Sequence, residues 1–139
     1  MFEKKLKVIL ILMAIVSCEI LGGCSIEQTS GTKIKDLEYE IVEDEKIPEE
    51  LRAIIEEKKA ADFRTTYDME QERYIVRGYG EQATGGYSIR VKDCYLTSNA
   101  ILFDTELIGP RKGEVTSPNP SYPYIVIKLA KSDENVIFE

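Results

Sequence analysis

Residues 84–110 read Thr-Gly-Gly-Tyr-Ser-Ile-Arg-Val-Lys-Asp-Cys-Tyr-Leu-Thr-Ser-Asn-Ala-Ile-Leu-Phe-Asp-Thr-Glu-Leu-Ile-Gly-Pro. Two runs rich in β-branched and aromatic residues flank a short polar segment at 97–100, which is the pattern of a β-hairpin. In the first run Tyr87, Ile89 and Val91 alternate with polar residues, so one face can pack on a core while the other meets water. The stretch predicts a central hairpin around which the rest of the chain is arranged.

Length and charge set limits on what the chain does. It has 139 residues, a formal net charge of −7 and no histidine, and this length suits one domain. An acidic balance argues against binding to nucleic acid, which needs clustered cations. The missing histidines remove the commonest general base and most zinc sites. We therefore expect a protein that is not an enzyme and that holds no metal or other cofactor.

The first 24 residues have the pattern of an export signal. Three lysines within the first seven residues precede an apolar run at 8–16, which is shorter than the ~20 residues that a membrane-spanning helix needs. The sequence Leu21-Gly22-Gly23-Cys24 follows and resembles the bacterial lipobox. This resemblance implies a signal peptide at 1–23, lipidation of Cys24 and a lipid-anchored tether at 24–35. We expect an extracytoplasmic lipoprotein anchored in the cell membrane.

Other interpretations of this segment stay open. Ile15-Val16-Ser17-Cys18 also fits the lipobox, and Glu19 counts against the longer signal that Cys24 requires. Leu at −3 and Gly at −1 favour Cys24 over Cys18. An uncleaved signal anchor or a plain secretory signal is a further alternative. If the chain is cleaved before Cys24, Cys18 is removed, Cys24 carries the lipid and Cys94 has no disulfide partner. We interpret Cys94 as a small apolar residue within a strand.

One helix is predicted over 47–60. Ile47, Leu51, Ile54 and Ile55 form an apolar stripe at helical spacing, which indicates a core-facing side. Pro48 suits the first helical position, where a backbone N–H would have no partner. The neighbouring glutamates are interpreted as a solvated face.

Five further segments have strand patterns, at 37–42, 63–69, 72–79, 124–129 and 136–138. The segment 124–129 is apolar on both faces, which predicts a central strand. Together with the hairpin and the helix, these segments predict a single α+β domain at 36–139. We expect a curled antiparallel sheet of about six strands, mostly connected by hairpins, with one amphipathic helix covering one side.

Two irregular segments are candidate binding loops. Residues 80–86 contain the pair Gly85-Gly86, which permits a sharp bend. Residues 109–123 hold four of the five prolines, and each proline fixes its φ angle. A long loop with a fixed backbone in a small domain is typical of a binding loop.

The second half of the chain resembles the C-terminal domain of PrcB-type lipoproteins. The resemblance rests on a Thr-Gly-Gly-Tyr strand entry within 80–89, a Pro-x-x-Gly loop within 109–113 and a Tyr-Pro-Tyr strand entry within 121–129. It covers about 72–131. It implies a non-enzymatic accessory subunit of a cell-surface protease complex, which binds and stabilises a subtilisin-like protease.

Two alternatives to this function remain. Thr84-Gly85-Gly86-Tyr87 also resembles the loop with which chagasin-type inhibitors block cysteine proteases, although it has one glycine too many and the expected Trp is missing. A structural envelope lipoprotein without a protease partner is the other.

Exposed Tyr and Arg side chains often carry interface energy. The predicted partner-binding residues are Thr84, Gly85, Gly86, Tyr87, Arg111, Tyr122, Pro123 and Tyr124.

The opposing interpretation is that the glycines only form a turn and that Tyr87 and Tyr124 only fill the core. A joined, exposed surface made by 84–87 and 109–124 would favour binding. A buried turn would favour the structural role.

Overall fold

The computed structural model describes residues 32–139. This part contains eight strands, one 3₁₀ helix and one α-helix. The elements are β1 (Lys35–Asp36), β2 (Glu40–Ile41), η1 (Asp44–Lys46), α2 (Glu49–Lys58), β3 (Asp62–Asp68), β4 (Glu72–Tyr79), β5 (Ser88–Leu96), β6 (Ala100–Ile108), β7 (Tyr124–Ala130) and β8 (Asn135–Phe138).

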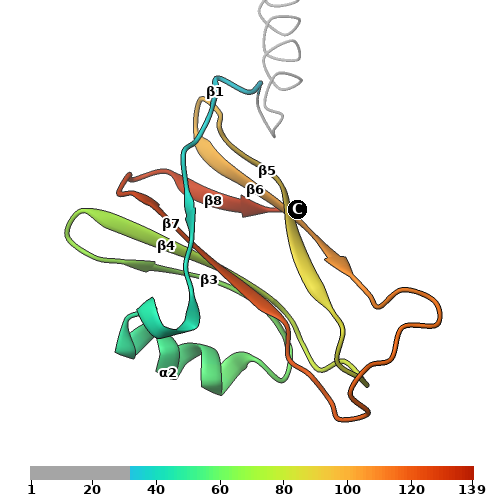
Figure 1. Ribbon diagram of the computed structural model, residues 1–139. Helices are drawn as coiled ribbons and strands as arrows, with labels where there is room; N and C mark the ends of the chain where they lie inside the picture. Colours follow the sequence, from blue (N-terminus) through green and yellow to red (C-terminus); the bar gives the residue numbers. More distant parts are fainter. Residues whose placement is uncertain (1–31) are drawn as a thin grey trace, which may run out of the picture. The chain divides into compact units, whose positions relative to one another are not determined.

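The strands form two four-stranded sheets, in the orders β1-β5-β6-β8 and β2-β7-β4-β3 (Figure 1). The predicted hairpin is present as the antiparallel pair β5–β6, and β3–β4 is a second hairpin. Strand β7 pairs with β4 along its whole length and is central in its sheet, as the sequence predicted. Because β7 pairs with β4 and β8 pairs with β6, the chain crosses between the sheets after β6 and again after β7.

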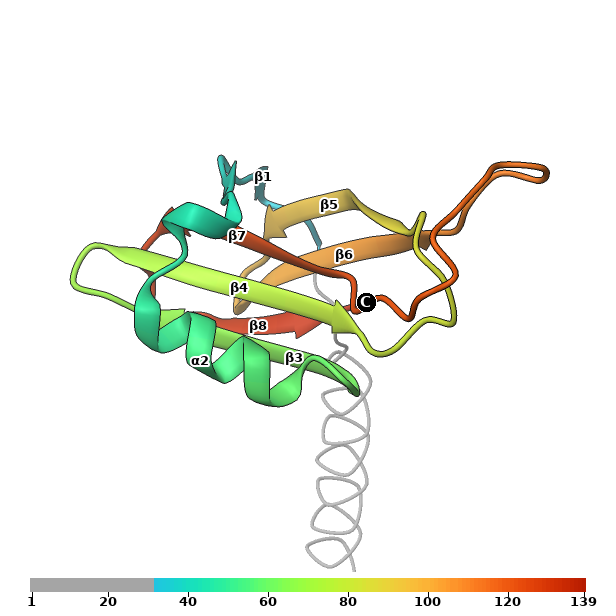
Figure 2. The same ribbon diagram turned by 60° about the horizontal axis from the view of Figure 1, so that its bottom comes forward.

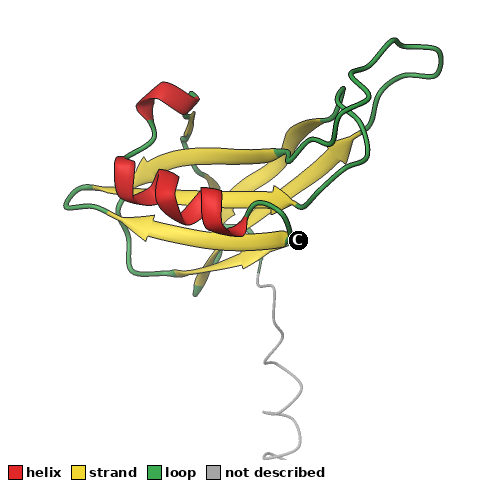
Figure 3. Cartoon of the chain, turned by 90° about the horizontal axis from the view of Figure 1, so that it is seen from below, coloured by secondary structure: helices red, strands yellow, loops and turns green. Residues whose placement is uncertain are grey.

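Helix α2 covers the outer face of the β2-β7-β4-β3 sheet (Figure 3). Its side chains Leu51 and Ile55 are fully buried there against Tyr74, Val76 and Val126. The predicted apolar stripe is therefore a core face, although Ile54 is only half-buried. Burying a Leu or Ile side chain stabilises a fold by about 1.5–3 kcal/mol, so this contact fixes the helix on the sheet.

The inner face of the same sheet packs on the β1-β5-β6-β8 sheet. Ile75 and Ile127 come from one sheet, and Ile101 and Phe103 from the other. All four are at most 1% exposed. Strands β4 and β7 are thus covered on both faces, which explains why both have long apolar runs.

The expected single curled sheet of about six strands is wrong. The described residues form eight strands in two sheets, and β8 runs parallel to β6. Of the strand expected at 37–42, only the two residues of β2 are present, because the chain leaves the first sheet after β1 and joins the second at β2. Strands of two residues, such as β1 and β2, are too short to give a periodic pattern. The α+β class and the mostly β content are confirmed.

The helix boundaries also differ from the prediction of 47–60. Helix α2 spans Glu49–Lys58, and Pro48 is its N-cap with ψ of 142°, not its first helical residue. Ile47 is 5% exposed and packs in the helix-side core from a position just before the helix. The helical spacing of Ile47 therefore predicted its burial correctly, but the predicted helix began two residues too early.

Candidate functional site

The two candidate loops lie side by side at one end of the described domain. We call residues 80–87 and 109–123 the joined loops. Gln82 and Ser121 form an isolated antiparallel bridge, with backbone bonds of 2.8 and 3.0 Å. The Gly85 N–H donates to the Ser117 carbonyl at 3.0 Å. Segments about 35 residues apart in sequence are therefore held together by their backbones.

Side chains add to this connection. The Ser121 hydroxyl donates to the Thr84 carbonyl at 2.7 Å. The Tyr87 ring lies against Gly109, where a Cβ atom would come within 3.3 Å of a ring carbon. Thr84 and Tyr87 are both half-buried. Both residues act first as links between the loops, with part of their surface left exposed.

Gly86 is required by this packing. Its φ of +89° is in the left-handed region that other residues rarely adopt. A Cβ atom at this position would lie 2.7 Å from the Thr116 methyl carbon and 3.0 Å from Pro110. Gly86 is exposed on its open side, so the backbone itself forms part of the surface. The Gly85-Gly86 pair thus makes the turn and also allows the second loop to approach.

The longer loop ends in a projecting turn. Figure 2 shows the segment after β6, coloured orange, extending beyond the ends of the strands. The turn is closed by the Glu114 N–H, which donates to the Arg111 carbonyl at 2.9 Å. The Glu114 carboxylate accepts from the Arg111 N–H at 2.8 Å. The side chains of Arg111, Lys112 and Val115 are exposed.

Tyr122 lies at the flank of the joined loops, beside the C-terminal end of α2. Its hydroxyl donates to the Glu81 carboxylate at 3.0 Å, and this bond raises the pKa of the Tyr122 phenol. The Lys59 ammonium lies 5.4 Å from the centre of the Tyr122 ring, within the range of a cation–π contact. Tyr122 is half-buried and is oriented by two neighbouring charges.

Tyr124 directly follows the joined loops, but its side chain turns away from them. Its ring packs against the helix-side core, and its hydroxyl donates to Asp44 at 3.0 Å. Burial, and then this bond, raise the pKa of Tyr124 to about 12. Between the two tyrosines, the Pro123 carbonyl accepts from the Tyr79 N–H at 3.1 Å. Of the predicted residues, the structure brings together Thr84 to Tyr87, Arg111 and the flanking Tyr122, and it separates Tyr124.

Sequence reasoning did not single out Val115, Ser117 or Ser121. Val115 is 97% exposed, the largest value among the exposed apolar side chains of the described residues. A lone valine in a polar loop has no periodic signal. The contacts of Ser117 and Ser121 depend on how the two loops meet, which only the fold determines.

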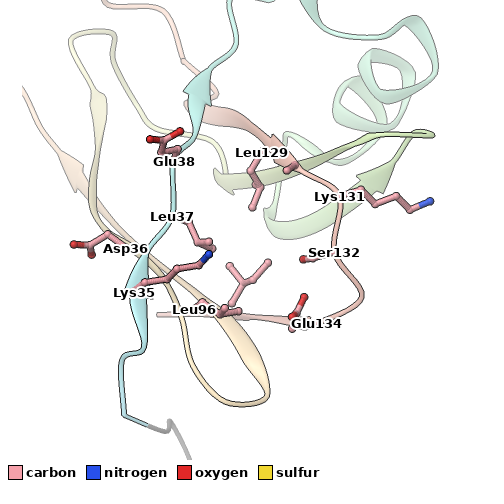
Figure 4. Close-up of a pocket in the computed structure, with 11 residues that line it drawn as sticks. Lys35, Asp36, Leu37, Glu38, Leu96, Leu129, Lys131, Ser132 and Glu134 are labelled. Atoms are coloured by element: carbon pink, nitrogen blue, oxygen red, sulfur yellow. The ribbon is translucent and has the colours of Figure 1, made fainter.

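A cleft of about 560 Å³ opens at the opposite end of the domain (Figure 4). Its floor is apolar, with Leu37, Leu96, Ile101 and Leu129, and charged side chains stand at its rim. The predicted binding residues lie outside this cleft. The cleft and the joined loops are therefore separate features.

Three other expectations concern chemistry and membranes. Cys94 is buried, and desolvation raises the pKa of its thiol to about 11, which makes it a poor nucleophile. Residues 32–139 contain no group of three or more side chains placed to hold a metal ion. No helix in this range has the length and apolar character needed to cross a bilayer. Cys24, Cys18 and the predicted signal peptide lie outside the described residues.

Comparison with known proteins identifies one part of the chain. Neither the curated proteins nor the solved structures include a match. The family model described as PrcB C-terminal matches residues 73–130, from Arg73 in β4 to Ala130 at the end of β7. Both joined loops lie inside the matched segment. The match over 73–130 therefore supports the similarity to the PrcB C-terminal family that the sequence motifs predicted.

Proposed function

We propose that this chain is a non-enzymatic accessory subunit that binds and stabilises an extracytoplasmic subtilisin-like protease. The joined loops are the binding surface in this proposal. The family match supports an association with a protease complex. It includes both loops and the strands that carry them.

The observation that carries the proposal is the connection between the loops. A bridge, a backbone hydrogen bond and the Ser121–Thr84 bond fix their relative position. The projecting turn nevertheless leaves the side chains of Arg111 and Lys112 exposed. A surface that is already ordered loses less conformational entropy on binding, which favours tight association. This arrangement suits recognition of another protein's surface better than enclosure of a small molecule.

The proposal includes a membrane anchor at Cys24. A lipid attached there would hold the domain near the membrane on the outer side of the cell, where a secreted protease acts. Metabolic labelling with an alkynyl fatty acid tests this part. We expect Cys24→Ser to abolish labelling and Cys18→Ser to retain it. The opposite result would assign the lipid to Cys18, and labelling of neither cysteine would exclude a lipoprotein.

Co-purification tests the partner. The tagged full chain is expressed in its native cells, the membranes are solubilised in detergent, and bound proteins are identified by mass spectrometry. The test variant is Arg111→Glu with Tyr122→Ala. The matched control is Lys35→Glu with Tyr39→Ala, which makes the same changes of charge and size at exposed positions outside the loops.

We expect a subtilisin-like protease with the native chain and with the control, and at least tenfold less with the test variant. Recovery of no such protease with the native chain, or equal recovery with both variants, would contradict the proposal. The purified complex then separates two roles. A stabilising subunit leaves peptide hydrolysis intact and lengthens the half-life of the protease, whereas loss of hydrolysis would indicate a chagasin-like inhibitor.

A further inference from the structure

The projecting turn carries an apolar side chain that the fold does not use. Val115 is 97% exposed, whereas the next most exposed large apolar side chain, Ile34, is 60% exposed. A valine that contacts almost nothing contributes almost nothing to the stability of its own domain. Its full apolar area is available to a partner.

The backbone around Val115 is held in place. The Arg111–Glu114 turn is closed by one backbone hydrogen bond and by the carboxylate of Glu114. On the other side, Ser117 is bound to Gly85. Val115 is therefore presented from a short segment that is fixed on both sides, as an anchor residue requires.

The charges beside Val115 define the partner's chemistry. Arg111 and Lys112 are exposed and make no ion pair within the described residues. The one acidic side chain of the turn, Glu114, accepts the Arg111 backbone N–H. Among residues 32–139, eight of the thirteen other Lys and Arg side chains form an ion pair with a carboxylate. The Glu114 carboxylate keeps its negative charge, so the turn presents two cations without an ion pair and has a net charge of +1, on an otherwise acidic protein.

We propose that Val115 inserts into an apolar pocket on the partner protease and that acidic groups at the rim of this pocket pair with Arg111 and Lys112. This inference rests on the proposed function and adds the chemistry of the contact. Apolar burial supplies affinity, and the opposite charges supply orientation and association rate.

The test measures the dissociation constant of the full chain for the subtilisin-like protease purified from cells that lack this chain. Val115→Asp removes the apolar anchor, and Ile34→Asp makes the same change at the other most exposed apolar position. The charge variant is Arg111→Glu with Lys112→Glu. Its control, Lys35→Glu with Lys131→Glu, changes the net charge equally at the end that carries the cleft.

We expect Val115→Asp to weaken binding at least tenfold and Val115→Leu to retain it. The charge variant should weaken binding and reduce its dependence on salt. Both controls should bind like the native chain. If the native chain binds and the Val115 and charge variants bind equally well, the inference is overturned while the proposed function stands. If the native chain does not bind the protease, the proposed function fails and the inference fails with it.

Lipid vesicles test whether the projecting turn binds a membrane surface instead of a protease. Phosphatidylcholine vesicles with about one third phosphatidylglycerol are mixed with each full-length variant that lacks the lipidated cysteine. The inference predicts that Val115→Asp and native chains bind these vesicles equally. Loss of vesicle binding in Val115→Asp, with protease binding unchanged, would overturn the inference and assign the turn to the membrane surface.

Discussion

The helix-covered sheet and the joined loops use apolar side chains in opposite ways. Leu51 of α2 is 0% exposed and packs within a core cluster. Val115 of the projecting turn is 97% exposed and belongs to no core cluster. Both regions have a fixed backbone, but only the first is fixed by burial. In the second, hydrogen bonds and a glycine turn hold the chain.

This difference separates stability from binding. Changes in the helix-covered sheet should unfold the domain, and changes at the projecting turn should alter binding alone. Changes at the contact between the loops should fall between these limits, because that contact positions the turn. Four substitutions test this division, and two of them have a matched control substitution.

The largest effect is expected in the helix-covered core. Leu51→Ala removes a fully buried side chain and leaves a cavity between α2 and the sheet, so we expect a loss of about 2–5 kcal/mol in the free energy of unfolding. Urea denaturation measures it. Ile54→Ala, at a half-buried position of the same helix, should cost much less. Equal losses would show that α2 packs differently.

The contact between the loops comes next. Gly86→Ala introduces a Cβ atom that clashes with Thr116 and Pro110 at a residue with φ of +89°, and we expect a loss of about 1–3 kcal/mol. Gly113→Ala is the matched control, because Gly113 has φ of +85° but no atom within 4 Å of its added Cβ. The difference between the two unfolding free energies isolates the contact. If both variants lose the same amount, the loops do not pack as described.

A smaller effect should appear at high pH through Tyr124. Burial raises the pKa of this phenol to about 12, above the value of about 10 expected in an unfolded chain. The stability gained is therefore complete below about pH 10 and is lost as pH rises towards 12. We expect the free energy of unfolding to fall less with rising pH in Tyr124→Phe than in the native chain. The difference should be about 1 kcal/mol after allowance for solvent screening. Parallel stability curves for the two proteins would contradict this role of Tyr124.

The smallest effect on stability is expected at the projecting turn. Val115→Ala should change the free energy of unfolding by less than about 0.5 kcal/mol, because the side chain is almost fully exposed. Urea denaturation again measures it. A larger loss would mean that Val115 packs within its own chain, and the separation of stability from binding would no longer hold at this position.

The sequence predicted the parts of the fold that have regular periodicity. The hairpins β3–β4 and β5–β6, the core side of α2 and the central position of β7 follow from alternation and helical spacing. The division into two sheets does not, because it depends on β7 pairing with β4 and on β8 joining β6. Those choices are made by long-range packing on the two faces of β4 and β7.

The sequence predicted the site less completely. The glycines and prolines marked both loops, and the structure places the loops together. Tyr124 was predicted with the loops, but its ring packs against the helix-side core. Alternation along the strand could not distinguish a tyrosine that faces this core from one that faces a partner. Val115 was not identified, since a single exposed valine is visible only once its surroundings are known.

The most direct test of the proposed binding surface is photo-crosslinking in intact cells. A photoreactive phenylalanine analogue is placed at position 115 or, as a control at the other most exposed apolar residue, at position 34. We predict a covalent adduct between position 115 and a subtilisin-like protease, with the attachment point in an apolar pocket beside acidic residues, and no such adduct from position 34. Adducts to the same protease from position 34 alone, or to no protease from either position, would contradict the account.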